Sequence, residues 1–540
     1  MPSQSPQSAT NVIVGAGVAG LVCALELARA GQSVVLIERQ NEKRRGGLAR
    51  WAFGGMALVG TELQQRMGVD DTPETAYRDW CNFADFEEGD YWPRQWAQAY
   101  VQESNADVYQ WLLKEGFKFM PAVNWVERGL FGDGNTRPRY HVMWGTGFHL
   151  VETLFGKLAE QQLKKLVEIR YEQTVTKLEA NDSGYLLHIE SDTGEAYTLD
   201  AERLILACGG INGSVEQVRA NWPSDQGPMP LEILNGAHPD ADGALHHQVS
   251  NIGGRLTHLD KMWNYAAGIA HPQAHYPGHG LSLIPCKSAL WLNAEGDRIG
   301  PMPLVTGFDT NDLCRRVNEQ QGEHTWHVLN WKIATKELAI SGSEHNVHIR
   351  DRNQLRFFKD LLFGNKALVN RMLKESVDFI QAETLEALAA KMSQLTPEWP
   401  ISADQLQLQV NLYDEQLGAK KALQNDEQVR RIEHARQWRP DRLRTCKPEP
   451  LQTLKNGPFI AIRLKFISRK SLGGIQTNLS SQVLDLQGLP MNNLYAIGEA
   501  AGFGGGGISG RRSLEGTFLS CCVHTARRAA SAILQGGQSE

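Results

Sequence analysis

The 540-residue sequence contains few cysteines, and their spacing does not suit metal or haem binding. The eight cysteines stand at positions 23, 81, 208, 286, 314, 446, 521 and 522, without a C-x-x-C or C-x-x-C-H motif. We therefore predict no structural zinc, no attached c-type haem, no redox dithiol and no metal-binding residues. The adjacent Cys521 and Cys522 lie in an apolar helical stretch, which favours plain buried thiols over a redox pair.

The sequence also lacks a long apolar run and an excess of positive charge. Its longest nearly apolar stretch, residues 12–25, is interrupted by three glycines and is too short to cross a bilayer as a helix. The start, MPSQSPQSAT, has neither the basic nor the apolar region of a secretory signal. With 55 basic against 61 acidic residues, the net charge is -6, which gives no general attraction for nucleic acid. We expect a cytoplasmic protein with no nucleic-acid partner and no membrane span.

Glycine, in contrast, is abundant and clustered. The 52 glycines gather at 15–20, 46–55, 209–213, 473–474 and 502–510. Residues from about 285 to 450 instead show the pattern of charged amphipathic helices, with a break at Pro397–Pro400. We predict an α/β fold. Both chain ends, residues 1–284 and 456–540, form a Rossmann-like nucleotide-binding domain, and an α+β or helical capping domain, residues 285–455, is inserted between them.

The segment NVIVGAGVAGLVCALELARAGQSVVLIER predicts a dinucleotide-binding strand, helix and strand. Gly15 allows the tight turn, Gly17 the approach of a pyrophosphate, and Gly20 the close packing of helix on strand. The helix N-terminus then faces the phosphates, and Glu38 at the end of the second strand is placed to bind a ribose. The contacts expected from this unit are Gly15, Ala16, Gly17, Val18, Ala19, Gly20, Glu38 and Arg39.

Small residues elsewhere favour FAD over NAD. The loop RRGGLARWAFGGM has little side-chain bulk at its glycines, so its backbone can approach an extended ligand. Two later strands, residues 203–210 and 494–502, also end in small residues. Each strand alone is equally typical of a buried parallel strand with a glycine turn, but together they favour FAD. Further cofactor contacts are expected at Gly46, Gly47, Leu48, Gly54, Gly55, Ala207, Gly209, Gly498 and Glu499.

Together these features resemble the FAD-dependent fumarate reductase, succinate dehydrogenase and 3-ketosteroid dehydrogenase superfamily. The resemblance covers most of the chain and is greatest to a group of bacterial FAD-binding dehydrogenases. Its stretches are PRYHVMWGTG (138–147), MWNYAAGI (262–269), ELAISGSEHN (337–346), SRKSLGGIQTN (468–478) and GEAAGFGGGGISGRRSLEGTFLSCC (498–522). It implies an active site between FAD domain and cap, where hydride moves between flavin N5 and a carbon–carbon bond next to a carbonyl or carboxyl group. It also implies a small-molecule substrate and a separate electron donor or acceptor.

The resemblance extends to single residues of the cofactor site. It implies that Glu499 holds the ribityl chain, and that Ser513 and Leu514 offer backbone N–H groups to the flavin pyrimidine edge. A helix begins near Leu514, and its positive end would stabilise anionic reduced flavin. Because residues 44–55 contain no histidine, where membrane fumarate reductases attach the cofactor, we predict non-covalent FAD.

The chain departs from the catalytic patterns of these families. Residues 301–312 carry no arginine or lysine where fumarate reductases have a proton-donating arginine, and Arg469 stands near the position of their histidine. Steroid dehydrogenases have a tyrosine in the segment where this chain has Ile460. We therefore do not expect the complete set of catalytic residues of either the fumarate reductases or the steroid dehydrogenases in this chain.

The candidate catalytic residues are Arg512, Arg469, Tyr265 and His279. Arg512, also a possible cofactor contact, offers a planar set of donors for a carboxylate or carbonyl, with a structural ion pair as the alternative. Tyr265 and His279 are candidates for proton transfer, with structural roles as the alternative. A structural role is also open for His141.

Three functions remain open from the sequence. The first is an FAD-dependent oxidoreductase acting on CH–CH groups. The second is a flavin monooxygenase, against which stands the lack of a second G-x-G-x-x-G for a nicotinamide domain. The third is a non-catalytic flavin-binding protein.

Overall fold

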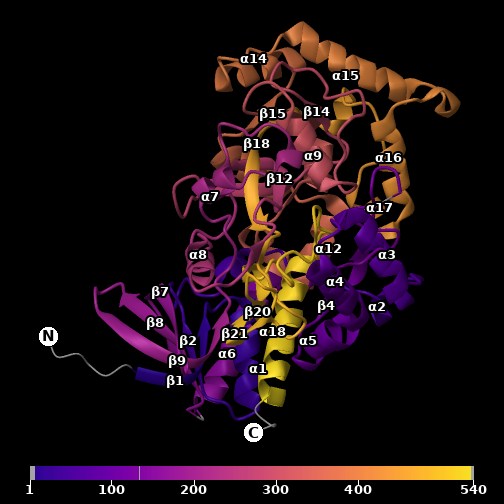
Figure 1. Cartoon of the computed structure of the whole chain (residues 1–540). Helices are drawn as coiled ribbons and strands as arrows, with labels where there is room; N and C mark the ends of the chain where they lie inside the picture. Colours follow the sequence, from indigo (N-terminus) through magenta and orange to yellow (C-terminus); the bar gives the residue numbers. More distant parts are fainter. Residues whose placement is uncertain (1–6, 133, 164, 537–540) are drawn as a thin grey trace.

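A computed structural model describes residues 7–132, 134–163 and 165–536. Residues 1–6 of the polar start lie outside this range. Two large sheets organise the chain, one at each end of the molecule as drawn in Figure 1. No helix in the described ranges is both long and apolar enough to span a bilayer.

The first sheet has eight strands and combines both ends of the chain, with the order β20-β21-β9-β1-β2-β6. Strand β1 (Gln7–Val14) pairs in parallel with β2 (Val34–Ile37) and β9 (Ala196–Leu206), and β21 (Pro490–Ala496) pairs in parallel with β9. Helix α1 (Val18–Arg29) forms the crossover that the parallel pair β1–β2 requires. The predicted Rossmann-like domain from both chain ends is confirmed. The other strands are β6 (Val167–Arg170), β7 (Gln173–Asn181), β8 (Gly184–Ser191) and β20 (Gln482–Leu484).

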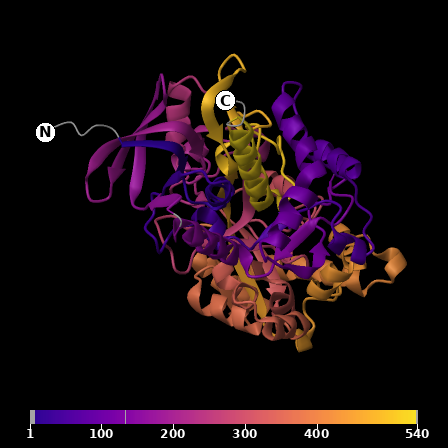
Figure 2. The ribbon, with the colours of Figure 1, turned by 90° about the horizontal axis from the view of Figure 1, so that it is seen from below.

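Helix α18 (Thr517–Gly536) closes this domain at the C-terminal end of the chain. It shares one hydrophobic core with α1 and α6 (Thr146–Leu163), to which Leu21, Leu154 and Val523 contribute. Figures 1 and 2 show α18 between the first sheet on one side and the helices of residues 62–114 on the other. The N-terminal end of α18 is thereby directed into the middle of the molecule.

The second sheet belongs to the cap and has the order β14-β15-β18-β12-β13-β16. Its long strand β18 (Phe459–Ser471) pairs antiparallel with β12 (Met262–Ala270) and β15 (Thr325–Asn330). This sheet therefore crosses both expected boundaries, because β12 precedes residue 285 and β18 follows residue 455. Its other strands are β10 (Leu234–Asn235), β13 (Gly280–Ile284), β14 (Leu290–Leu292), β16 (Ala339–Ile340) and β17 (Phe379–Ala382).

Helices surround the cap sheet, as the amphipathic pattern indicated. They are α9 (Thr310–Asn318), α10 (Trp331–Glu337), α11 (Val347–Arg350), α12 (Gln354–Phe363), α13 (Lys366–Glu375), α14 (Leu385–Leu395), α15 (Ala403–Gly418), α16 (Glu427–Gln437) and α17 (Arg439–Arg444). Figure 1 shows α14 and α15 at the far end from the first sheet. Helix α17 instead lies low in the cap, where its C-terminal residue reaches the region between the domains.

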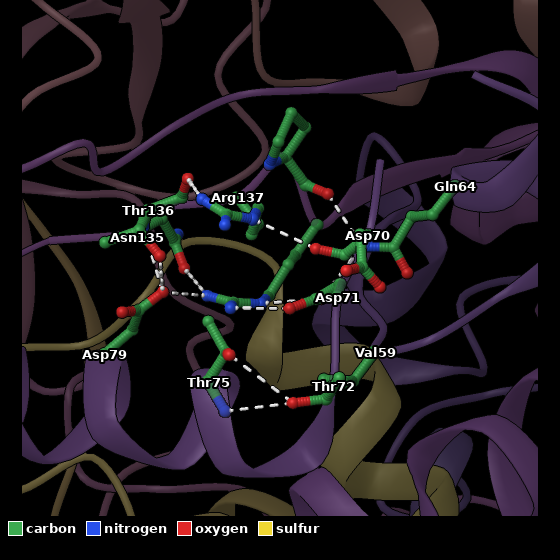
Figure 3. Close-up of polar contacts among 12 residues, drawn as sticks. Val59, Gln64, Asp70, Asp71, Thr72, Thr75, Asp79, Asn135, Thr136 and Arg137 are labelled. Atoms are coloured by element: carbon green, nitrogen blue, oxygen red, sulfur yellow. Dashed lines mark hydrogen bonds and ion pairs between the residues drawn. The ribbon is translucent and has the colours of Figure 1, made fainter. Parts of the chain in front are cut away.

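A smaller unit between the sheets is held by a buried ion network, shown in Figure 3. Arg139 is 3% exposed, and its Nε and Nη2 donate to the two carboxylate oxygens of Asp71 at 2.9 and 2.7 Å. Its Nη1 donates to Asp79 at 2.7 Å. Such a paired and hydrogen-bonded arginine fixes the start of the strand that follows it. That strand, β5 (Tyr140–Met143), begins at the next residue and forms a three-stranded sheet with β3 (Gly55–Ala57) and β4 (Phe119–Asn124).

Aromatic residues of the same unit pack in its interior. Trp96 and Tyr100 on α4 (Tyr91–Glu103) are fully buried. His141 is also fully buried, and its ring nitrogens contact the Thr61 hydroxyl at 2.8 Å and the Arg139 carbonyl at 2.7 Å. His141 thus has a structural role. The remaining helices of the unit are α2 (Glu62–Arg66), α3 (Pro73–Ala84) and α5 (Trp111–Lys114).

Candidate active site

Two cavities meet where the first sheet faces the cap. The first, about 160 Å³, lies at the carboxyl ends of β1, β2 and β9. The second, about 270 Å³, lies between the FAD domain and the cap. Leu48, Ala49, Glu499 and Cys522 line both cavities. Ligands of open α/β sheets bind at these strand ends, so the joined cavities form one extended binding site.

The glycine turn after β1 has the geometry that the sequence predicts. A Cβ atom at Gly15 would lie 2.4 Å from the Ala207 carbonyl oxygen, and one at Gly20 would lie 2.0 Å from the Gly15 oxygen. A Cβ atom at Gly17 would meet no protein atom within 4 Å, and Gly17 lines the first cavity. Gly15 and Gly20 thus serve packing, while Gly17 leaves room for a ligand.

Glu38 is fixed at the end of β2 in the first cavity. Its carboxylate accepts hydrogen bonds from the backbone N–H groups of Ala16 and Gln40, both at 2.8 Å. Burial raises the pKa of this carboxyl group, although both hydrogen bonds favour its ionised form. An anchored carboxylate at this place can accept hydrogen bonds from a ribose diol.

Most of the predicted cofactor residues line these cavities. In the first cavity they are Gly15, Ala16, Gly17, Val18, Ala19, Glu38, Arg39, Gly46, Gly47, Leu48, Ala207, Gly209 and Glu499. In the second they are Leu48, Gly54, Gly55 and Glu499. Gly20 and Gly498 line neither cavity. A Cβ atom at Gly498 would lie 2.9 Å from the Ala19 Cβ, so this glycine allows close packing beside the cofactor turn.

Arg512, Ser513 and Leu514 do not line either cavity. The Arg512 guanidinium donates to the Asp309 carboxylate at 2.7 Å and to the Phe83 carbonyl at 2.9 Å. The structure therefore does not bring Arg512 to the place expected for a catalytic cation, because Asp309 holds it elsewhere. Glu515 and Gly516, directly before α18, line the second cavity instead.

Tyr265 and Glu515 form a hydrogen-bonded pair in the second cavity. The Tyr265 hydroxyl donates to Glu515 Oε2 at 2.5 Å, and the Trp263 indole N–H donates to the same oxygen at 3.0 Å. Burial and the neighbouring Glu515 carboxylate raise the pKa of Tyr265 well above its usual range. Tyr265 is thus a neutral phenol at physiological pH, able to donate a proton within a cavity that can hold a substrate.

Four basic residues also line the second cavity, namely Lys287, Arg444, Arg469 and Lys470. One of these cations, Lys470, stands near the end of β18. Its ammonium lies 4.2 Å from the centre of the Phe518 ring. Burial lowers its pKa, and the nearby carboxylates of Glu515 and Glu499 oppose that change. Glu499 is partly buried, which raises its pKa, and its carboxylate accepts a hydrogen bond from the Ser471 N–H at 3.0 Å.

The second cation, Arg444, is the last residue of α17 in the cap. Its guanidinium hydrogen-bonds to no other group in the described part of the chain, although burial lowers its pKa. Burial and the Glu515 charge raise the pKa of Tyr140, whose side chain also lines the cavity, and the Arg444 charge opposes that change. The cavity thus has a cation from the cap, although residues 301–312 contain no arginine or lysine.

Arg469 and His279, the other catalytic candidates, mark the border of this site. Arg469 lines the second cavity and a small one behind it, and its Nη1 donates to the Gly236 carbonyl at 3.0 Å. His279 lines only the small cavity, where its ring stacks on His271 with centroids 4.2 Å apart. The structure therefore separates His279 from Tyr265 and brings Arg469 between the two.

Several cavity residues were missed from the sequence. Tyr140, Lys470 and Glu515 lie within stretches that carry the family resemblance, which was the available signal. Arg444 and Glu127 lie outside them, and only the packing of the cap on the FAD domain brings them to the cavity. Cys522, expected as a plain buried thiol, lines both cavities.

The fold and this extended cavity define a dinucleotide-binding flavoprotein. The chain matches the family described as FAD binding domain over residues 10–519, and it belongs to that family. It is an FAD-dependent oxidoreductase.

Known relatives agree with this class. A KsdD-like steroid dehydrogenase of Mycobacterium tuberculosis is 38% identical over 540 residues, covering 97% of this chain and 95% of the relative. An open flavocytochrome c3 fumarate reductase has the same fold, with a TM-score of 0.70 at 20% identity, over 98% of this chain and 79% of that one. A 3-ketosteroid delta1-dehydrogenase from Sterolibacterium denitrificans, in complex with 1,4-androstadiene-3,17-dione, gives a TM-score of 0.70 at 15% identity, over 98% of this chain and all of that one (100%).

Proposed function

We propose that this enzyme oxidises or reduces the carbon–carbon bond beside the carbonyl group of an apolar, multi-ring ketone of the steroid type. The observation that carries the proposal is the second cavity, in which the Tyr265–Glu515 pair and Arg444 lie beside a large set of apolar side chains. The mycobacterial relative named as a steroid dehydrogenase supports this substrate class. The apolar lining includes Phe53, Val126, Ala266, Leu283, Ile284, Trp291, Leu313, Phe503 and Phe518.

The residues present fit FAD. The open space at Gly17 admits a pyrophosphate, Glu38 is oriented for a ribose, and Glu499 stands where the two cavities join. FAD, when bound, supplies the acceptor or donor of hydride. The loop of residues 44–55 has no histidine side chain for a covalent link, so this chain holds FAD through these non-covalent contacts.

Tyr265 handles the proton in this proposal. In the direction of oxidation the Tyr265 oxygen accepts the proton that leaves the carbon while its own proton passes along the hydrogen bond to the Glu515 carboxylate. In the direction of reduction both transfers run in reverse. The Trp263 N–H donates to the same Glu515 oxygen and helps to fix its position.

Arg444 polarises the substrate carbonyl. Proton loss beside a carbonyl builds negative charge on its oxygen, and a fixed cation in a dry cavity stabilises that charge effectively. The unused donors of Arg444 can provide this interaction without breaking a protein hydrogen bond. A separate electron donor or acceptor completes the turnover.

Anaerobic mixing with a ketosteroid tests the proposal. The FAD-loaded enzyme is mixed with 4-androstene-3,17-dione, the steroid bound in a related solved structure, and the oxidised flavin absorbance is followed. We expect the absorbance to fall. Dithionite-reduced enzyme should in turn be reoxidised by 1,4-androstadiene-3,17-dione. If neither steroid changes the flavin, the substrate class is wrong.

Two variants test the roles of the residues. Tyr265→Phe should slow flavin reduction about a hundredfold, the usual contribution of a positioned proton donor. Tyr185→Phe is the matched control, because the Tyr185 hydroxyl donates to the Asn492 carbonyl at 2.8 Å in the FAD-domain sheet, away from the cavity. Equal rates in the two variants would contradict the role of Tyr265.

A further inference from the structure

A cluster of four histidines and a glutamate lies outside the active-site cavity. His271, His275 and His279 occupy the loop between β12 and β13 at spacings of four residues. Glu344 and His345 come from the short helix η4 (Ser343–His345) in the cap. We call these five residues the histidine cluster. Two separate chain segments thus bring nitrogen and oxygen ligands to one place.

The Glu344 carboxylate lies at the centre of the cluster. Its Oε1 is 2.6 Å from His271 Nε2 and 3.4 Å from His345 Nε2, and its Oε2 is 3.8 Å from His275 Nε2. The ligand atoms of His271, Glu344 and His345 lie within 4.8 Å of one another, as do those of His271, His275 and His279. In a tetrahedral zinc site, bonds near 2.0–2.1 Å place the ligand atoms about 3.3 Å apart. Small side-chain movements therefore suffice for coordination.

Two of the histidines have ring nitrogens that no protein hydrogen bond uses. His345 is only 6% exposed; its Nδ1 has no hydrogen-bond partner, and its Nε2 has only the long 3.4 Å contact with Glu344. Buried polar atoms are nearly always satisfied, so this pair of nitrogens indicates a missing partner. The ring of His275, which is exposed at the edge of the cluster, also makes no hydrogen bond in the described part of the chain.

The other two histidines are constrained by backbone hydrogen bonds. His271 Nδ1 accepts from the Gln273 N–H at 3.0 Å, and His279 Nδ1 accepts from the His275 N–H at 3.2 Å. Their Nε2 atoms therefore carry the ring protons, and His271 donates its proton to Glu344. His271 can join a metal only by opening its bond to Gln273.

We propose that the histidine cluster binds one divalent transition-metal ion, with zinc as the best match. His275 and His345 supply ring nitrogens, and Glu344 and His271 complete the site once the hydrogen bond between them opens and the His271 ring turns. Imidazole and carboxylate ligands in four-coordinate geometry are those of zinc. The sequence pointed away from metal because it contains no cysteine motif, whereas this site uses no cysteine.

The ion would have a structural task. No residue of the histidine cluster lines the second cavity, although Leu48, Ala52, Ser341 and Arg469 line both that cavity and the small one beside the cluster. Trp51, on the cofactor loop that also carries Leu48, stacks on His275 with ring centroids 5.5 Å apart. Coordination would therefore join the cap segment of η4, the β12–β13 loop and the cofactor loop. This proposal does not depend on the identity of the substrate.

Metal analysis of tag-free holoenzyme tests the site. The FAD-loaded protein is dialysed against metal-free buffer, and its metal content is measured by plasma mass spectrometry. We expect about one zinc ion per chain, the content of a single structural site, and loss of that zinc in H275A and H345A. His247→Ala is the control, because His247 is an exposed histidine outside the cluster. Zinc present equally in wild type, H275A and H345A would overturn the site.

A second measurement keeps the test valid if wild type loses its metal in purification or a variant folds poorly. Cobalt(II) is added to metal-stripped holoenzyme and to E344Q, which preserves the size of the side chain. We expect tetrahedral cobalt bands and a rise in melting temperature for wild type only, since a ligand that binds the folded state stabilises it. Cobalt that neither gives such bands nor raises the melting temperature of wild type would refute the proposal.

Discussion

For Arg512, the sequence predicts a catalytic role and the structure indicates a structural one. The variant Arg512→Met distinguishes the two roles. As a catalytic cation, Arg512 would be needed for turnover, and its loss would cost about a hundredfold in rate, the usual effect of removing one charge-stabilising donor. In the structure it neutralises Asp309, whose side chain is 4% exposed. We therefore expect a loss of stability and not of turnover.

The magnitude follows from the burial of the pair. Removing one partner of a buried ion pair costs about 3–5 kcal/mol, because the other charge is left uncompensated. The Arg512 side chain is 18% exposed, so water partly screens the pair and we expect about 3 kcal/mol, the lower end of that range. Asp309 keeps one hydrogen bond, from the Asp312 N–H at 3.0 Å, where it caps α9.

Urea unfolding, followed by tryptophan and flavin fluorescence, measures this loss. The double variant Arg512→Met/Asp309→Asn is the control. It removes both charges and should recover part of the stability, since the stability changes caused by substituting the two partners of one ion pair are not additive. If Arg512→Met unfolds like wild type and its flavin-loaded form loses turnover by about a hundredfold, the structural assignment is refuted and the catalytic one stands.

Three further predictions concern the cofactor and the cavity. Glu38→Ala should weaken FAD binding by about 1–3 kcal/mol without changing turnover at saturating FAD, as measured by cofactor titration. Lys470→Met should lower the flavin midpoint potential, measured by dye equilibration, because a cation favours the anionic reduced flavin; an unchanged potential would place Lys470 away from the ring. Burial raises the pKa of Glu127 from 4.5 to about 8, so the folded state holds the proton more tightly than the unfolded chain does. As the pH rises from 4.5 to about 8, the unfolding free energy of wild type should therefore fall more steeply than that of Glu127→Gln. Parallel pH profiles of the two proteins in urea unfolding would contradict this.

The sequence by itself determined the cofactor domain. The turn of Gly15, Gly17 and Gly20 is a local motif: Gly20 packs against Gly15 and Ile13, and Gly17 leaves room for a ligand, although Gly15 also packs against Ala207 at the end of β9. The position of Glu38 follows from the same pattern, because Glu38 comes directly after the second strand of this unit. A strand–turn–helix unit carries its geometry in adjacent residues, and such a motif can be predicted without knowing the rest of the fold.

Only the tertiary structure decided which side chains meet in the catalytic cavity. Tyr265 from β12, Glu515 before α18 and Arg444 from α17 are far apart in the chain, and cap packing alone brings them together. Arg512 is close to Glu515 in sequence, yet Asp309 draws it away from the cavity. A spacing pattern contains no information on such long-range ion pairs, because the partner is chosen by how two domains pack and not by neighbouring residues.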